Sequence, residues 1–281
     1  MIKAISYWST ENGLAGTNPI EAAVQAVKGA GFEGIELSIG DAGVLHIESS
    51  EADCQAIRQQ VDAGGLALQT AACGLSWGLN PTSNDPSVRA AAIDAHRKAL
   101  QRAGWLGCQA MLMVPGVVTS PIAPDECVRY DHAVARVQEA VEALLPTAEE
   151  SGVDLCLENV WNGLFLSPLE LRDFVDQFSS QRIGVYLDVG NLLRYHQYPP
   201  HWIELLGERI KRVHIKEFNE TFGFVGGYMF SDLMNGQVPW AATMQALRDV
   251  GYDRTLVAEM LPHDSGTLER TSAAMNVILA M

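Results

Sequence analysis

Four side chains of the kinds that bind divalent metal ions stand at or near the ends of four short apolar segments in the second half of the chain. They are Glu158, Asp188, His214 and Glu259. Three carboxylates with one imidazole suit a hard or borderline cation, which is Mn or alternatively Mg, Co or Zn. Burying three carboxylates together without a cation would be very costly. The sequence therefore predicts one divalent metal ion held by these four residues.

Each of the four residues also has an ordinary structural explanation when it is taken alone. A carboxylate at a strand end often caps the following helix or pairs with a Lys. A single His is more often a hydrogen-bonded core residue than a ligand. These explanations would have to hold separately on four successive strands, so the metal site is the better hypothesis.

A repeated unit surrounds these residues: a short apolar run, polar residues and then an amphipathic helix. Most of the apolar runs are continuous, as expected for parallel strands that are covered on their outer side. The predicted strands are Ile2–Ser6, Gly34–Ser38, Ala67–Ala71, Gln109–Val114, Asp154–Glu158, Ile183–Asp188, Arg212–Ile215 and Thr255–Glu259.

Helices are expected in the gaps between these strands. Asn18 is the predicted cap of the first helix, and Pro146 is expected to kink or split the fourth. Gly31, Gly104, Gly152 and Gly251 are predicted to end helices in the left-handed conformation. The predicted helices are Pro19–Gly29, Glu51–Ala63, Pro86–Ala103, Glu126–Glu150, Pro168–Phe178, His201–Gly207, Trp240–Val250 and Gly266–Leu279.

Eight strand–helix units in 281 residues fit a closed (β/α)8 TIM barrel of the α/β class better than an open doubly wound sheet. The residues after the first strand, Tyr7-Trp8-Ser9-Thr10, do not form a dinucleotide-binding loop. With no low-complexity linker, a single domain over 1–281 is expected. Active sites of this fold lie at the carboxyl ends of the strands, where the four predicted ligands would meet.

Composition and charge disfavour several classes of partner and indicate where the protein is expected in the cell. A net charge of −15 disfavours nucleic acid and anionic membranes. The five cysteines contain no CxxC pair and are expected to be reduced thiols without a disulfide framework. The N-terminal segment lacks a signal peptide pattern, and no segment reaches the roughly 20 apolar residues of a membrane helix. A cytoplasmic protein is expected, and the sequence is compatible with a homo-oligomer.

The residues from 154 to 262 resemble the xylose-isomerase-like barrels, which include sugar and sugar-phosphate isomerases and epimerases. The resemblance implies a divalent-metal-dependent enzyme with a small-molecule carbohydrate substrate. It is carried by Glu158-Asn159, Asp188-Val189-Gly190-Asn191, His214-Ile215-Lys216-Glu217 and Glu259-Met260.

The tagatose 3-epimerase branch of that family implies a division of labour among the ligands. Glu158 and Glu259 would move a proton on opposite faces of the carbon next to a carbonyl, through a metal-stabilised enediolate. Asp188 and His214 would serve as ligands only. The resulting expectation is a ketose 3-epimerase, or an aldose–ketose isomerase, that acts on a small sugar or sugar phosphate.

Two positions depart from that branch. Asn191 stands where many of those epimerases have a substrate-contacting His, and Leu164 stands where they carry another Glu. The Asp-Val-Gly-Asn form of the strand-six motif instead resembles the ribulose-phosphate and xylulose-phosphate 3-epimerase branch. The class of reaction is thus better indicated than the sugar.

Further residues at the same rim are predicted to bind the substrate. Lys216 should point the same way as His214 by strand alternation, where it would bind a substrate oxygen or balance Glu217. The Trp side chains would stack on a sugar face or simply cover the barrel mouth. The Gly-rich segment 218–239 is a predicted lid. The predicted substrate-binding residues are Trp8, Trp161, Asn191 and Lys216, with Glu36 and Trp77 as further pocket candidates.

Three other functions stay open at this point. A metal-dependent lyase or deglycosidase acting on a 3-keto-sugar derivative would use similar enolate chemistry. An apurinic endonuclease would need more His ligands and a basic DNA groove, which the net charge of −15 disfavours. A non-catalytic binding protein would require the complete set of four ligands to be vestigial.

Overall fold

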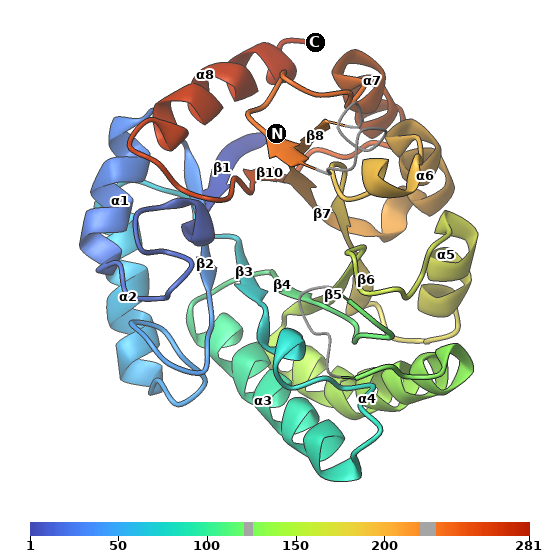
Figure 1. The fold of residues 1–281 in the computed structure, drawn as a ribbon. Coiled ribbons are helices and arrows are strands. Elements are labelled where there is room, and N and C mark those ends of the chain that lie inside the picture. Colours follow the sequence, from blue (N-terminus) through green and yellow to red (C-terminus); the bar gives the residue numbers. More distant parts are fainter. Residues whose placement is uncertain (121–125, 220–228) are drawn as a thin grey trace.

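The structure, a computed structural model, describes residues 1–120, 126–219 and 229–281. Within these residues, eight parallel strands close into a barrel in the order β1-β10-β7-β6-β5-β4-β3-β2, and helices surround it (Figure 1). The (β/α)8 TIM barrel prediction is confirmed. The barrel strands are β1 Ile2–Ser6, β2 Gly34–Ser38, β3 Thr70–Cys73, β4 Ala110–Met113, β5 Asp154–Glu158, β6 Ile183–Asp188, β7 Ile210–Ile215 and β10 Thr255–Ala258.

Eight α-helices cover the outside of the barrel in the described part of the chain, and short 3-10 turns follow several strands. Two turns matter for the site because they begin where β1 and β3 end: η1 Tyr7–Ser9 and η2 Leu75–Trp77. The helices are α1 Ile20–Gly29, α2 Glu51–Ala63, α3 Pro86–Trp105, α4 Tyr130–Ser151, α5 Pro168–Asp176, α6 Pro199–Leu206, α7 Trp240–Asp249 and α8 Thr267–Leu279. None of the helices described is long and apolar enough to cross a membrane.

Two apolar layers hold the barrel together. The larger layer lies between the strands and the helices. The smaller layer fills the barrel interior and includes Ala72, Ala110, Cys156 and Tyr186. Because small residues dominate one side of this interior, the large Tyr186 side chain fits inside the closed barrel. Trp8, Trp77 and Val160 pack against this inner cluster and extend it toward the end of the barrel where the strands end.

The third strand and the fourth helix differ from their predictions. β3 occupies Thr70–Cys73 and not Ala67–Ala71. The apolar run there is continuous, so it does not mark where barrel pairing begins. α4 runs unbroken through Pro146, because buried Leu144 and Ala148 keep it packed on both sides of the proline.

Two of the predicted helix-end residues are also wrong. Asn18 does not cap α1: the cap position falls on Pro19, which makes no side-chain hydrogen bond there, and the Asn18 amide donates to Thr10 Oγ1 at 3.1 Å. Gly104 lies within α3, and the left-handed glycine follows at Gly107. Gly31, Gly152 and Gly251 do adopt positive φ angles as predicted.

A two-stranded antiparallel sheet follows β7, formed by β8 Glu217–Asn219 and β9 Met229–Ser231. Buried Glu217 supports it: its carboxylate accepts hydrogen bonds from Val238 N at 3.0 Å and Trp240 Nε1 at 2.7 Å. Its bonds therefore go to the segment around the sheet and to α7, and it does not need Lys216 as a partner. Residues 220–228 of the predicted lid lie outside the described residues.

Candidate metal centre and active site

The four predicted metal ligands meet at one end of the barrel. Asp188 and His214 are direct neighbours on β6 and β7. Glu158 ends β5, and Glu259 follows β10. His214 Nδ1 lies 3.3 Å from Glu158 Oε1 and 3.4 Å from Glu259 Oε2. One ligand atom from each of the four buried residues lies within 4.8 Å of the other three, so the barrel closure brings together what the chain separates.

Glu36 orients the imidazole from the side opposite the other carboxylates. Its Oε1 lies 2.9 Å from His214 Nε2. Thr70 Oγ1 donates to Glu36 Oε2 at 3.2 Å, and the Tyr186 hydroxyl donates to the same oxygen. A proton on Nε2 satisfies Glu36 and leaves the lone pair of Nδ1 facing Glu158 and Glu259. Carboxylates commonly fix metal-binding imidazoles in this way.

This contact corrects the interpretation of Glu36 as a pocket residue. Strand alternation correctly indicates that its side chain points into the barrel. It lies beneath His214, fully buried, and does not line the cavity. How deep a side chain lies inside a barrel depends on the stagger of the strands, which a single strand sequence does not show.

Replacing Glu36 by Ala is expected to lower the affinity for Mn²⁺ by about 10- to 100-fold, because the imidazole loses the partner that holds its tautomer and orientation. Glu36→Gln retains an acceptor for Nε2 and should have the smaller effect. Titration with Mn²⁺ followed by electron paramagnetic resonance measures the change. The matched control is Glu139→Ala on the exposed side of α4. Unchanged affinity in Glu36→Ala would contradict the assigned role.

Lys216 brings a positive charge to the same centre, as its strand position predicts. Its Nζ lies 3.0 Å from Asp188 Oδ2 and 2.6 Å from Glu259 Oε2. Burial alone would lower the pKa of Lys216, but the carboxylates of Asp188 and Glu259 outweigh burial and raise it. The side chain is therefore an ammonium group that borders the cavity.

The two glutamates differ in their ionisation. Burial raises the pKa of Glu158 to about 7, although His214 favours its charged form. Burial also acts to raise the pKa of Glu259, but Lys216 and His214 outweigh it and hold that pKa below its usual range. Carboxylates of one site whose pKa values are pushed apart can act as an acid and a base in the same reaction.

Two asparagines hold the end of β6 in place. Asn159 binds the backbone of Asp188 through two hydrogen bonds: its Oδ1 accepts from Asp188 N, and its Nδ2 donates to Asp188 O, both at 2.8 Å. Asn191 N donates to Asp188 Oδ1 at 2.9 Å, and Asn191 Nδ2 donates to Asn159 O at 3.0 Å. Asn191 also lines the cavity. The structure thus adds a positioning role to the predicted substrate contact, and Asn159 gains a role the sequence did not indicate.

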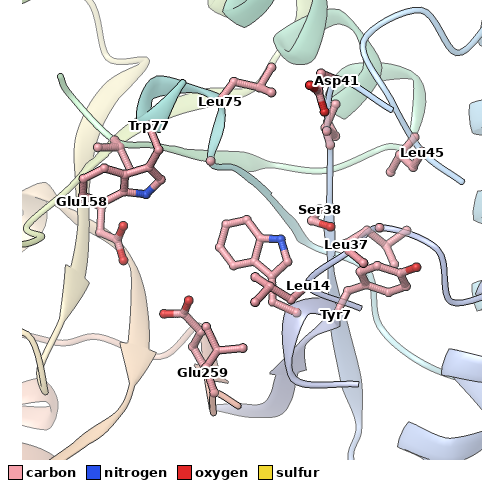
Figure 2. A pocket seen from close by; sticks show the side chains of 18 of the residues that line it. Tyr7, Leu14, Leu37, Ser38, Asp41, Leu45, Leu75, Trp77, Glu158 and Glu259 are labelled. Carbon is pink, nitrogen blue, oxygen red and sulfur yellow. The ribbon is translucent and has the colours of Figure 1, made fainter. Parts of the chain in front are cut away.

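A cavity of about 490 Å³ opens at this centre and is lined by two of the four predicted ligands, Glu158 and Glu259. It is lined by all four predicted substrate-binding residues and by Trp77. Figure 2 shows the carboxylates of Glu158 and Glu259 both aimed into it. The protein itself occupies part of the Trp161 ring: Phe230 stacks on it at 4.7 Å, and the Arg194 guanidinium lies 4.3 Å from the ring centroid. These two contacts reduce the ring surface that Trp161 can offer to a sugar.

The sequence profile of a family described as the xylose isomerase-like TIM barrel matches residues 24–279. The chain belongs to this family. The resemblance drawn from the motifs at the strand ends is thereby confirmed, and it extends over nearly the whole barrel.

Several curated proteins and solved structures are similar to this chain. The D-psicose 3-epimerase of Enterocloster bolteae is 27% identical over 247 residues, which are 86% of this chain and 77% of that protein. The D-psicose 3-epimerase of Agrobacterium fabrum is 26% identical over 251 residues, 87% of this chain and 80% of that protein. A crystal structure of the D-psicose 3-epimerase with D-tagatose from Clostridium cellulolyticum H10 matches with a TM-score of 0.80 and 21% identity, covering 99% of each chain.

The four residues fit the divalent metal ion that the family implies. Asp188 Oδ2 is buried and accepts no hydrogen bond from the described residues, and Glu259 Oε2 is buried with the Lys216 ammonium 2.6 Å away. One imidazole nitrogen and three carboxylates are a donor set for a hard or borderline cation. The single positive charge of Lys216 does not neutralise the three carboxylates. The site therefore keeps a net negative charge, which favours a divalent cation.

Proposed function

We propose that the protein is a divalent-metal-dependent sugar epimerase that moves a proton at the carbon next to a carbonyl, in the manner of a ketose 3-epimerase. The observation that carries the proposal is the pair Glu158 and Glu259, which face one cavity from β5 and from the end of β10. The names of the curated relatives, D-psicose 3-epimerases, support the same reaction.

The side chains divide the work of this reaction. One of the two glutamates, Glu158 or Glu259, acts as a general base on one face of the carbon, and the other returns a proton to the opposite face as a general acid. Proton return on the opposite face is what inverts the carbon. A divalent ion on Glu158, Asp188, His214 and Glu259, for which we favour Mn, would supply a Lewis acid that stabilises negative charge on the substrate oxygens. Lys216 adds a fixed positive charge beside them.

The walls of the cavity support the chemistry. Trp8, Trp77 and Trp161 border it and limit the access of water to the reacting carbon. Its volume of about 490 Å³ suits a small molecule. The net charge of −15 does not suit a nucleic acid, which makes an apurinic endonuclease the weaker interpretation.

The proposal is tested by hydrogen exchange at the carbon next to the carbonyl. Protein loaded with Mn²⁺ is incubated in deuterated water with a panel of ketoses, ketose phosphates and 3-keto-glycosides, and the loss of the proton signal is followed by NMR. Exchange is expected with at least one compound, together with the appearance of its epimer. If metal-loaded protein exchanges the proton of none of them, the proposed proton transfer is wrong.

A further inference from the structure

The cavity at the candidate metal centre has two chemically different halves. One half contains Glu158, Glu259, Lys216 and Asn191. The other is formed by the end of β2, the loops after β1 and β2, and Leu75 of η2. In Figure 2, Leu37, Ser38 and Leu45 lie across the cavity from the two glutamates, whereas Trp77 of η2 lies beside Glu158. Ser38 and Asp41 are polar there. The apolar side chains of this half, which we call the apolar half, include Leu14, Ile20, Leu37, Ile39, Val44, Leu45 and Leu75.

The loops that build the apolar half are tied to each other. Val44 N donates to Gly16 O at 2.9 Å, and Gly40 N donates to Leu45 O at 3.1 Å. Gly43 has a φ of +101°, and a Cβ atom added to it would lie 2.3 Å from Gly16 O. Only glycine permits so close an approach in that conformation. The apolar wall is therefore a built feature and not a chance gathering of loop residues.

A sugar ring alone makes poor use of this half. Hydroxyl groups that lose water need hydrogen-bond partners, and this wall offers few of them. Leu14 is 65% exposed where it borders the cavity, so an apolar side chain faces water at the position where a ligand would cover it. A cavity of about 490 Å³ also falls in the range that holds drug-sized ligands.

Two aromatic rings are available to an apolar ligand. In the described part of the chain, Trp8 and Trp77 stack on no other ring, unlike Trp161. Trp8 lies against the start of η2, where a Cβ atom on Gly74 would be 3.3 Å from its ring. Both indoles border the cavity, where they can contact an aromatic group.

We propose that the substrate carries an apolar, preferably aromatic, substituent that binds in the apolar half while its keto-sugar part binds at the metal ligands. The substrate class is then a keto-glycoside with an apolar aglycone, in place of a free ketose. This inference rests on the proposed function, because the carbon that exchanges its proton must lie between Glu158 and Glu259.

In the test, Mn²⁺-loaded protein is incubated with the phenyl glycoside or with the methyl glycoside of the same 3-keto-glucose, and the two substrates are compared. The kcat/KM for deuterium exchange, measured by NMR, is expected to be about 10- to 100-fold higher for the phenyl compound, because the ring is removed from water. Leu14→Asp should reduce this phenyl-to-methyl ratio at least several-fold. Leu169→Asp, at a similarly exposed leucine on α5 outside the cavity, should leave the ratio unchanged.

Equal kcat/KM values for the two glycosides, or an unchanged ratio in Leu14→Asp, would overturn the inference and leave the proposed function standing. Release of phenol would identify the reaction as an elimination, contrary to the proposed epimerisation. A slower release in Leu14→Asp than in Leu169→Asp would then support the inference, and equal release would overturn it. If no compound exchanges its proton, the proposed function fails, and the apolar half is tested alone. Phenyl β-glucoside should then quench the indole fluorescence at lower concentration than methyl β-glucoside, and equal quenching would overturn the inference.

Discussion

Glu259→Gln is expected to lower the rate of epimerisation by about 10²- to 10⁴-fold, the usual contribution of a positioned general acid or base. Glutamine retains a carbonyl oxygen for the metal but cannot accept a proton. Because Glu158 remains, this variant should still exchange the proton of one epimer with deuterium on the face that Glu158 serves. The opposite epimer carries its proton on the face of residue 259, where no base remains, so that proton should not exchange with deuterium. NMR of each pure epimer in deuterated water measures both rates.

Glu158→Gln supplies the matched comparison, since both residues are buried glutamates at the same centre. It should show the mirror pattern, in which only the other epimer exchanges. Metal content and thermal unfolding of both variants must match the wild type, so that loss of the ion is not mistaken for loss of the base. Exchange of both epimers in both variants would mean that one other group moves the proton on both faces.

The convergence of the four candidate ligands could be predicted because strand ends in a closed barrel meet at one rim. An apolar run that terminates in a carboxylate shows both a strand and the position of its polar end, as in Ile183–Asp188, where the prediction and the structure agree. The direction of the Lys216 side chain could be predicted from the alternation of side chains along the strand beyond His214. These are local patterns, and the barrel converts them into contacts between strands that are far apart in the sequence.

Two features could not be predicted from the sequence: how deep a side chain lies inside the barrel, and how the loops pack against each other. Glu36 points inward as its strand position implies, yet the stagger of the barrel places it beneath His214, where it orients a ligand. The apolar half comes from loop residues such as Leu14 and Val44, whose packing follows no periodic pattern. The Gly16–Gly43 contact that positions them joins two separate loops, so neither loop sequence alone indicates it.

Loading with Mn²⁺ is expected to raise the free energy of unfolding by about 2.7 kcal/mol when the free ion stands at 100 times its dissociation constant. For a chain of this size the melting temperature should rise by roughly 5 °C. The stabilisation arises because the ion binds Glu158, Asp188, His214 and Glu259 only where the fold brings them together. Thermal unfolding of chelator-treated protein, with and without added Mn²⁺, measures the increment.

Asp188→Asn should separate stability from metal binding. Burial raises the pKa of Asp188, even though Lys216 favours its charged form, which shows that the charge is held at a cost in free energy. Asparagine keeps the oxygen that accepts from Asn191 N, and Lys216 keeps Glu259 as a partner. The chelator-treated variant should therefore unfold at or above the wild-type temperature, while its increment with Mn²⁺ should largely disappear. An undiminished Mn²⁺ increment in Asp188→Asn would place the ion elsewhere. A large loss of stability without Mn²⁺ would mean that Asp188 stabilises the barrel itself.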